Sequence, residues 1–227
     1  EEEEKYGCYD FGMMRSMVKI AVPSTLQQSI VQIGILLVQS VINSFGSTAI
    51  AGYSAGMRIE SLSIVPMLAM GNAMSTFTAQ NMGAGKIDRV KEGYRMCYVI
   101  VLTAGAVLCV MYQLAGGAFV SLFLDSGSSE AYSVGLSYVK FLSFFYSFIG
   151  LKASTDGLLR GAGDVTAFTV ANLVTLAIRV SVTNLFAPIY GIQVAWMAVP
   201  LGWAANYVIS FGWYLTGKWK KVRVIKK

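Results

Sequence analysis

The chain contains six apolar runs that are each long enough to cross the hydrocarbon core of a lipid bilayer. They cover residues 24–43, 49–80, 96–114, 132–151, 165–188 and 193–216. A helical crossing needs about twenty apolar residues, and backbone groups in hydrocarbon must find their hydrogen-bond partners within the segment. Runs of this length are too long for the strands of a membrane barrel. The sequence therefore predicts an all-α polytopic membrane protein with six transmembrane helices.

The composition excludes several other classes of protein. Apolar residues make up 55% of the 227 positions and charged residues 13%, whereas about 25% of residues are charged in ordinary soluble domains. So few charges cannot cover the surface of a soluble enzyme or keep a chain disordered. Histidine is absent, which removes imidazole ligands and any Ser–His catalytic pair. We expect no enzyme activity, no metal site and no cofactor.

The basic residues lie almost entirely on one side of the predicted membrane. The connections 44–48, 115–131 and 189–192 contain no Lys or Arg, whereas the other connections and the two ends hold fifteen of the eighteen. Cytoplasmic segments carry this excess of positive charge, so both termini are predicted in the cytoplasm of a multi-pass cell-membrane protein. The basic stretch 218–227 is interpreted as a tail that meets anionic lipid rather than nucleic acid.

Three regions are predicted along the chain. Residues 1–22 form a cytoplasmic linker and an amphipathic segment on the membrane surface, residues 23–217 the six-helix lobe and residues 218–227 the tail. Because the chain begins with Glu rather than Met, we expect it to be a piece of a longer protein.

Glycines mark the expected turns and one close helix contact. The tripeptide Gly-Ala-Gly occurs at 83–85 and 161–163, where glycine is expected to end the incoming helix in left-handed geometry. Asp88 and Asp164 follow and are expected to cap the next helices. The Gly52-xxx-Gly56 spacing is weakly indicative of a close approach by another helix.

Two spans carry polar stripes that would be costly against lipid. In the first span, four amides fall within an arc of about 60° at about 100° per residue: Gln28, Gln32, Gln39 and Asn43. In the fifth span, the stripe is Thr169, Asn172, Thr175, Arg179 and Thr183. Such stripes either make hydrogen bonds between helices or form the wall of an aqueous cavity, and their length favours the cavity. Arg179, at mid-span, is expected to face a cavity or to find a partner.

Glu60 in the second span is interpreted as the only carboxylate deep inside the membrane. A carboxylate in a low-dielectric cavity can carry a proton, hold Na⁺ or attract a cationic substrate. The alternative is a structural ion pair with Arg58 or Arg179, and the residues alone do not decide between the two.

Short motifs follow one another along the chain in a specific order and spacing. They read AVPSTLQQ at 21–28, NSFG at 43–46, RIE at 58–60, QNMGAG at 80–85, LRGAGD at 159–164 and GKW at 217–219. Over residues 11–220 they resemble the seventh to twelfth helices of multidrug and toxic compound extrusion (MATE) transporters.

This resemblance implies the C-terminal six-helix lobe of a twelve-helix antiporter, facing a complementary lobe from the same full-length chain or another copy. It implies efflux of small cationic or amphipathic compounds in exchange for H⁺ or Na⁺. NorM-like members carry acidic residues in the seventh and tenth helices. The matching helices here offer amides and Lys140, which favours members whose coupling carboxylate lies in the first lobe. From the polar residues of the spans, we expect Glu60 to recognise charge or carry the coupling ion, and we expect the cavity to be lined or supported by Gln28, Gln32, Gln39, Asn172 and Arg179.

Two other functions stay open at this point. A lipid-linked precursor flippase of the same superfamily shares the helical arrangement and needs a more cationic cavity, for which Arg58, Lys140 and Arg179 outnumber Glu60. A non-transporting membrane assembly subunit is the second, although such a scaffold gains nothing from the amide stripes.

Overall fold

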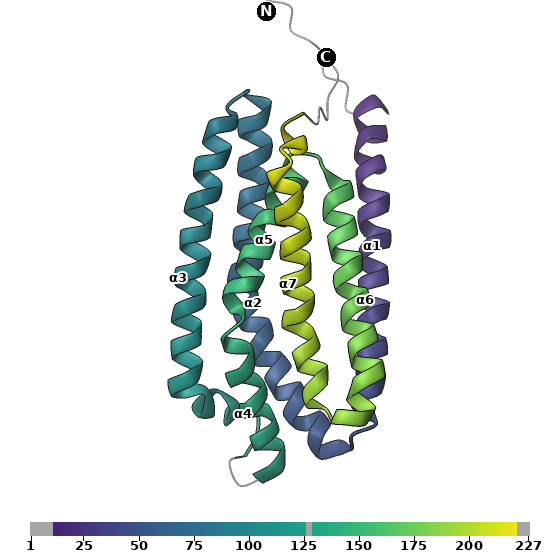
Figure 1. Cartoon of the computed structure of the whole chain (residues 1–227), viewed down its shortest axis with the longest axis vertical. Helices are drawn as coiled ribbons and strands as arrows, with labels where there is room; N and C mark the ends of the chain where they lie inside the picture. Colours follow the sequence, from purple (N-terminus) through teal and green to yellow (C-terminus); the bar gives the residue numbers. More distant parts are fainter. Residues whose placement is uncertain (1–10, 126–128, 222–227) are drawn as a thin grey trace, which may run out of the picture.

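The computed structural model describes residues 11–125 and 129–221, which form a bundle of helices without any strand in these ranges (Figure 1). The elements are α1 (Phe11–Asn43), α2 (Ser47–Gly83), α3 (Ile87–Val120), α4 (Ser129–Ser143), α5 (Tyr146–Gly161), α6 (Val165–Tyr190), α7 (Gln193–Leu215) and the short 3-10 helix η1 (Lys218–Lys221). The predicted all-α class is confirmed.

The connections between the helices alternate between the two ends of the bundle (Figure 1). The start of α1, the α2–α3 and α5–α6 connections and the end of α7 lie at one end, and the α1–α2 and α6–α7 connections at the other. The six predicted crossings follow in order as α1, α2, α3, the α4–α5 pair, α6 and α7. An even number of crossings returns the chain to the side on which it started, as the predicted orientation requires.

Within the described ranges, the helices differ in how fully they match a membrane crossing. The helices α2, α3, α6 and α7 are each long and apolar enough, and α4 with α5 makes a fifth crossing if the bent pair is one span. The apolar section of α1, Ser29–Asn43, is shorter. However, α1 continues as one helix of 33 residues from Phe11 through Pro23. The predicted surface segment is thus continuous with the first span, and its position on the membrane stays a prediction.

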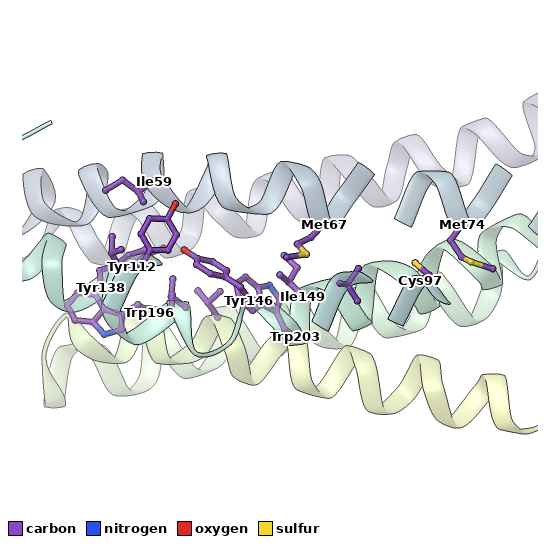
Figure 2. Close-up of a cluster of buried hydrophobic side chains, with 14 of the residues drawn as sticks. Ile59, Met67, Met74, Cys97, Tyr112, Tyr138, Tyr146, Ile149, Trp196 and Trp203 are labelled. Atoms are coloured by element: carbon purple, nitrogen blue, oxygen red, sulfur yellow. The ribbon is translucent and has the colours of Figure 1, made fainter. Parts of the chain in front are cut away.

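The helix α5 lies at the centre of the lobe. It packs against α2 and α3 on one side and against α7 and α6 on the other, while α1 packs mainly on α6. All residues from 153 to 159 are buried. The apolar core extends along the bundle, from Tyr138 and Trp196 near one end to Met74 and Cys97 near the other (Figure 2).

Glycines allow α2 to approach its two main neighbours closely. A Cβ atom on Gly52 would overlap α4, and one on Gly56 would overlap the ring of Tyr138. The close contact predicted from the Gly52-xxx-Gly56 spacing is therefore confirmed. Further along α2, Gly71 lies directly against Gly157 of α5, where backbone meets backbone.

The fourth crossing is broken between α4 and α5, which are inclined by 53° to each other. Its predicted end at Leu151 is wrong, because the second half continues as helix to Gly161. Lys152 therefore lies inside a helix rather than in a cytoplasmic connection, and fourteen basic residues remain on the predicted cytoplasmic side.

A side chain from another helix stabilises this break. The Gln113 amide of α3 donates hydrogen bonds to the Lys140 carbonyl oxygen (2.8 Å) and to the Ser143 hydroxyl oxygen (2.9 Å). In a continuous helix, the Lys140 carbonyl would accept its bond from the N–H of Phe144. A side chain that enters the backbone hydrogen-bond ladder in this way is a recognised cause of helix kinks.

The two Gly-Ala-Gly turns match the prediction more closely than the caps do. Gly85 and Gly163 have positive φ angles of 72° and 82°. Asp164 caps α6, since its carboxylate accepts a backbone N–H of the first turn at 3.4 Å. The cap predicted for α3 is wrong, because the carboxylate of Asp88 pairs instead with the Lys91 ammonium at 2.7 Å.

Candidate functional site

A cavity of about 140 Å³ lies between α1, α5, α6 and α7. Its polar lining residues are Lys152, Asn172, Thr175 and Arg179, and α1 and Trp203 add apolar walls. The fifth-span stripe predicted from the sequence thus places Asn172 and Arg179 on the wall of one cavity. Their role in binding a substrate or an ion stays a prediction.

The amide stripe of α1 faces away from this cavity. The residues that α1 contributes to the wall are Val31, Gly34, Ile35 and Val38, about 100° around the helix from the stripe. Gln32 is exposed, and the half-buried Gln39 donates a hydrogen bond to the Asn43 side chain at 2.9 Å. The side chain of Gln28 is outside the described part of the structure. The structure therefore does not bring Gln32, Gln39 or Asn43 together with Asn172 and Arg179.

Arg179 is the least satisfied polar group in the cavity wall. Its half-buried guanidinium has no hydrogen bond or ion pair with any other part of the described chain. The neighbouring Thr175 hydroxyl is already used, because it lies within hydrogen-bond distance of the carbonyl oxygens of Ala171 (2.9 Å) and Gly202 (3.1 Å). The five N–H donors of the guanidinium therefore have no acceptor on the described part of the chain, and Arg179 is a lining residue of the cavity.

Glu60 lies apart from the cavity, between α2, α4 and α7. The hydroxyl of Tyr138 donates a hydrogen bond to its carboxylate. The rings of Tyr53 and Trp196 pack edge-on against the Tyr138 ring, with centroids 5.2 and 5.6 Å away. The carboxylate therefore sits in a half-buried, largely aromatic pocket with one hydrogen-bond donor identified.

The ion pair considered for Glu60 is not found among the described residues. Arg58 is exposed, and Arg179 is near enough to attract the carboxylate electrostatically but does not contact it. Removal of the Glu60 charge would consequently not leave a directly paired cation behind.

The structure adds a charged pair that the sequence analysis missed. The Lys152 ammonium lies 3.1 Å from the Asp156 carboxylate, and the side chains are 16% and 6% exposed. Lys152 also donates to the side-chain amide oxygen of Asn172 at 3.2 Å, and the Ser210 hydroxyl donates to the Asp156 carboxylate at 2.7 Å. This network ties α5 to α6 and α7 at the cavity wall.

Asp156 is thus a second carboxylate inside the helical lobe besides Glu60, and its depth in the membrane stays open to test. Asp156 was not found from the sequence because the fourth apolar run ends at Leu151, before Lys152 and Asp156, whereas the helix continues to Gly161. One sequence signal was available: Lys152 and Asp156 are four residues apart with opposite charges, the spacing at which side chains meet on one helical face.

A cluster of hydroxyl groups lies beside this pair and was also missed. Tyr94 and Tyr98 of α3 are 2.7 and 2.8 Å from the Thr155 hydroxyl, and Tyr98 donates to Tyr207 of α7 at 3.4 Å. Isolated tyrosines in apolar helices give no sequence signal for such a cluster, because their spacing is also that of a packed core.

The proteins that this chain resembles have the membrane helices that its architecture indicates. The chain belongs to the MatE family, whose sequence profile matches residues 23–185. It is 28% identical over 209 residues to the probable multidrug resistance protein YpnP of Bacillus subtilis, covering 92% of this chain and 46% of that protein. The probable multidrug resistance protein YoeA of the same organism is 23% identical over 225 residues, covering 98% and 48%.

The fold is also that of solved MATE structures. A MATE crystal structure in a bent conformation superposes with a TM-score of 0.82 at 18% identity, covering 96% of this chain and 48% of that one. The chain is thus a multi-pass membrane protein of a transporter family, and it spans about half the length of the curated relatives it matches.

Proposed function

We propose that this chain is the C-terminal six-helix half of a secondary active transporter that expels organic cations and drugs in exchange for H⁺ or Na⁺. Membership of the MatE family supports transport. The multidrug resistance names of the relatives favour efflux over a flippase or an assembly subunit. Alternating access would then arise from movement of this lobe against a second one.

The uncovered polar surface of α1 supports this proposal most directly. Gln32 and Asn43 are exposed on a helix that otherwise exposes large apolar side chains, such as Leu36 at 67%. Amides are costly against lipid. A second lobe that covers α1 and encloses an aqueous space with it would remove this cost.

In this proposal the transporter lies in the cell membrane, and both ends of the chain are cytoplasmic. The connections and helix ends at that end of the bundle carry basic residues, among them Lys86, Arg160 and Lys218, as expected for the cytoplasmic side. Glu60 is the candidate for recognising cationic substrates or carrying the coupling ion, and the α1 amides line the space between the lobes.

Ethidium efflux tests the two-lobe proposal. Cells lacking their own ethidium pumps make this chain alone, a matching first six-helix lobe alone, or both together. We expect efflux only from cells that make both, because a single lobe leaves one side of the substrate pathway open. Equal membrane levels of the chain serve as the control. Ethidium efflux by the chain alone would contradict the proposal.

Replacement of Glu60 by glutamine is expected to lower efflux of cationic dyes by about tenfold or more without lowering the amount of protein. The amide oxygen still accepts the Tyr138 hydrogen bond, so the variant removes the charge and little else. Glu92→Gln is the matched control, because Glu92 is exposed near the start of α3. Both are measured in the two-lobe system. Normal efflux of several dyes by Glu60→Gln would exclude Glu60 from substrate recognition and coupling.

A further inference from the structure

The cavity between α1, α5, α6 and α7 has a positive wall. Lys152 and Arg179 are cations, Asn172 accepts a hydrogen bond from Lys152, and no carboxylate belongs to the described lining. The Lys152 charge is balanced by Asp156 outside the lining, at 3.1 Å. Arg179 has no such partner in the described part of the chain. The Glu60 carboxylate attracts Arg179 without touching it, so one cation of the cavity wall has no contacting counter-charge.

The Arg179 guanidinium has a shape that binds oxyanions well. A guanidinium presents planar pairs of N–H donors that match two oxygens of a carboxylate or a phosphate. An unpaired cation inside a membrane-spanning segment is costly. That cost falls when an anion or ordered water satisfies the donors, so the cavity favours a negatively charged occupant over a positive one.

The opposite walls are apolar. Gly34 and Val38 of α1 and Trp203 of α7 face the same space as the cations. An occupant that satisfies both walls has an acidic head and an apolar stem. The volume of about 140 Å³ is less than half of the about 300–1,000 Å³ typical of pockets that enclose a whole drug. The cavity thus fits one end of an amphipathic molecule.

We propose that this cavity is a binding subsite for the oxyanion head group of an amphipathic compound, with Arg179 as the principal contact. Lys152 and Asn172 flank the head group, and α1 and Trp203 pack on its stem. Two sources share this chemistry: a water-soluble amphiphile and an anionic lipid of the surrounding membrane.

This inference goes beyond the proposed efflux function. It adds anionic and zwitterionic amphiphiles to the compounds that the transporter would bind, and it places their acidic group away from Glu60. Binding to the cavity is a property of this chain alone. It can therefore be measured without transport, and a failure of the efflux experiments would not affect it.

Hexyl phosphate is a suitable probe, because its head is an oxyanion and its short stem leaves it soluble outside detergent micelles. The purified chain in a neutral detergent is titrated while tryptophan fluorescence and melting temperature are recorded. We expect a saturable fluorescence change, since Trp203 lines the cavity, and a rise in melting temperature from ligand linkage. Hexylammonium has the same stem with a positive head and is expected to give neither.

Substitutions identify the contact. Arg179→Gln is expected to weaken hexyl phosphate binding about tenfold or more, because charged hydrogen bonds are lost. Arg58→Gln removes an exposed cation of α2 outside the cavity and is expected to leave binding unchanged. Arg179→Lys keeps the charge but loses the paired donors, and is expected to bind with intermediate affinity. It serves in place of Arg179→Gln if that variant does not fold.

Lipid is tested in a second arm, with phosphatidic acid or phosphatidylcholine added to the micelles. Competition of phosphatidic acid with hexyl phosphate identifies a lipid head group as an occupant, and its absence identifies a soluble amphiphile; either result supports the subsite. Equal responses to hexyl phosphate and hexylammonium would overturn it. So would equal hexyl phosphate affinities of Arg58→Gln and of the folded Arg179 variant.

Discussion

Replacement of Asp156 by leucine is expected to destabilise the lobe by about 3 kcal/mol, because it leaves the largely buried Lys152 ammonium without its counter-charge. The Ser210 hydroxyl loses its acceptor on Asp156 in the same variant. The effect should be visible as a markedly lower melting temperature of the purified chain in detergent, and as less protein in the membrane.

The double variant Lys152→Met, Asp156→Leu separates loss of the pair from loss of the carboxylate. Buried ion pairs can be replaced by apolar residues of similar volume at little cost, so the double variant should recover most of the lost stability. Asp88→Leu is the matched control: it breaks the pair between Asp88 and Lys91, whose side chains are 89% and 40% exposed. No measurable change is expected there. Equal losses in the single and double variants would show that the stranded charge is not the cause.

Gly157→Ala is expected to cost about 3 kcal/mol or more, at the upper end of the range for overpacked cores. The new Cβ would overlap the Gly71 carbonyl of α2. Backbone cannot rotate away as a side chain can, so α2 and α5 have to separate along their interface, which is the most extensive helix contact in the described chain. Thermal unfolding in detergent measures the loss.

Gly212→Ala provides the control for this substitution. Gly212 lies within α7, and a Cβ there meets nothing within 4 Å. Because alanine favours the helix over glycine, Gly212→Ala should be neutral or stabilising by up to about 1 kcal/mol. If Gly157→Ala melts at the temperature of the unchanged chain, the two backbones are not in the close contact described here.

Most of the architecture could be predicted because membrane crossings depend on length and apolarity alone. Close packing at Gly52 and Gly56 and the turns at Gly85 and Gly163 were equally accessible, since they follow from the missing Cβ atom and from positive φ. The α4–α5 break was not accessible. Neither Phe144 nor Phe145 is a residue that marks kinks, and the stabilising group comes from α3, some thirty residues earlier.

The candidate site was predictable only in part. Helical periodicity placed Asn172 and Arg179 on one face, and the structure places both in one cavity wall. The same reasoning predicted that Gln32 lines the cavity, but its side chain is exposed on the outside of the lobe. Periodicity defines which residues share a helix face, and it does not define which neighbour that face meets. Asp156 was missed because a window that averages hydropathy excludes charged residues, even when they form a buried ion pair such as Lys152–Asp156.

The break in the fourth crossing also determines what straightening that crossing requires. Gln113 donates to two acceptors at the break, so a straightened fourth crossing has to compete with these bonds, which contribute about 1 kcal/mol each. Gln113 belongs to α3, a helix that presents mostly apolar side chains outward, among them Val107, Val110 and Leu114. A rotation of α3 about its own axis would withdraw the amide. The bend of the fourth crossing is thus held by a side chain of the outer helix α3, which contributes no residue to the described lining of the cavity.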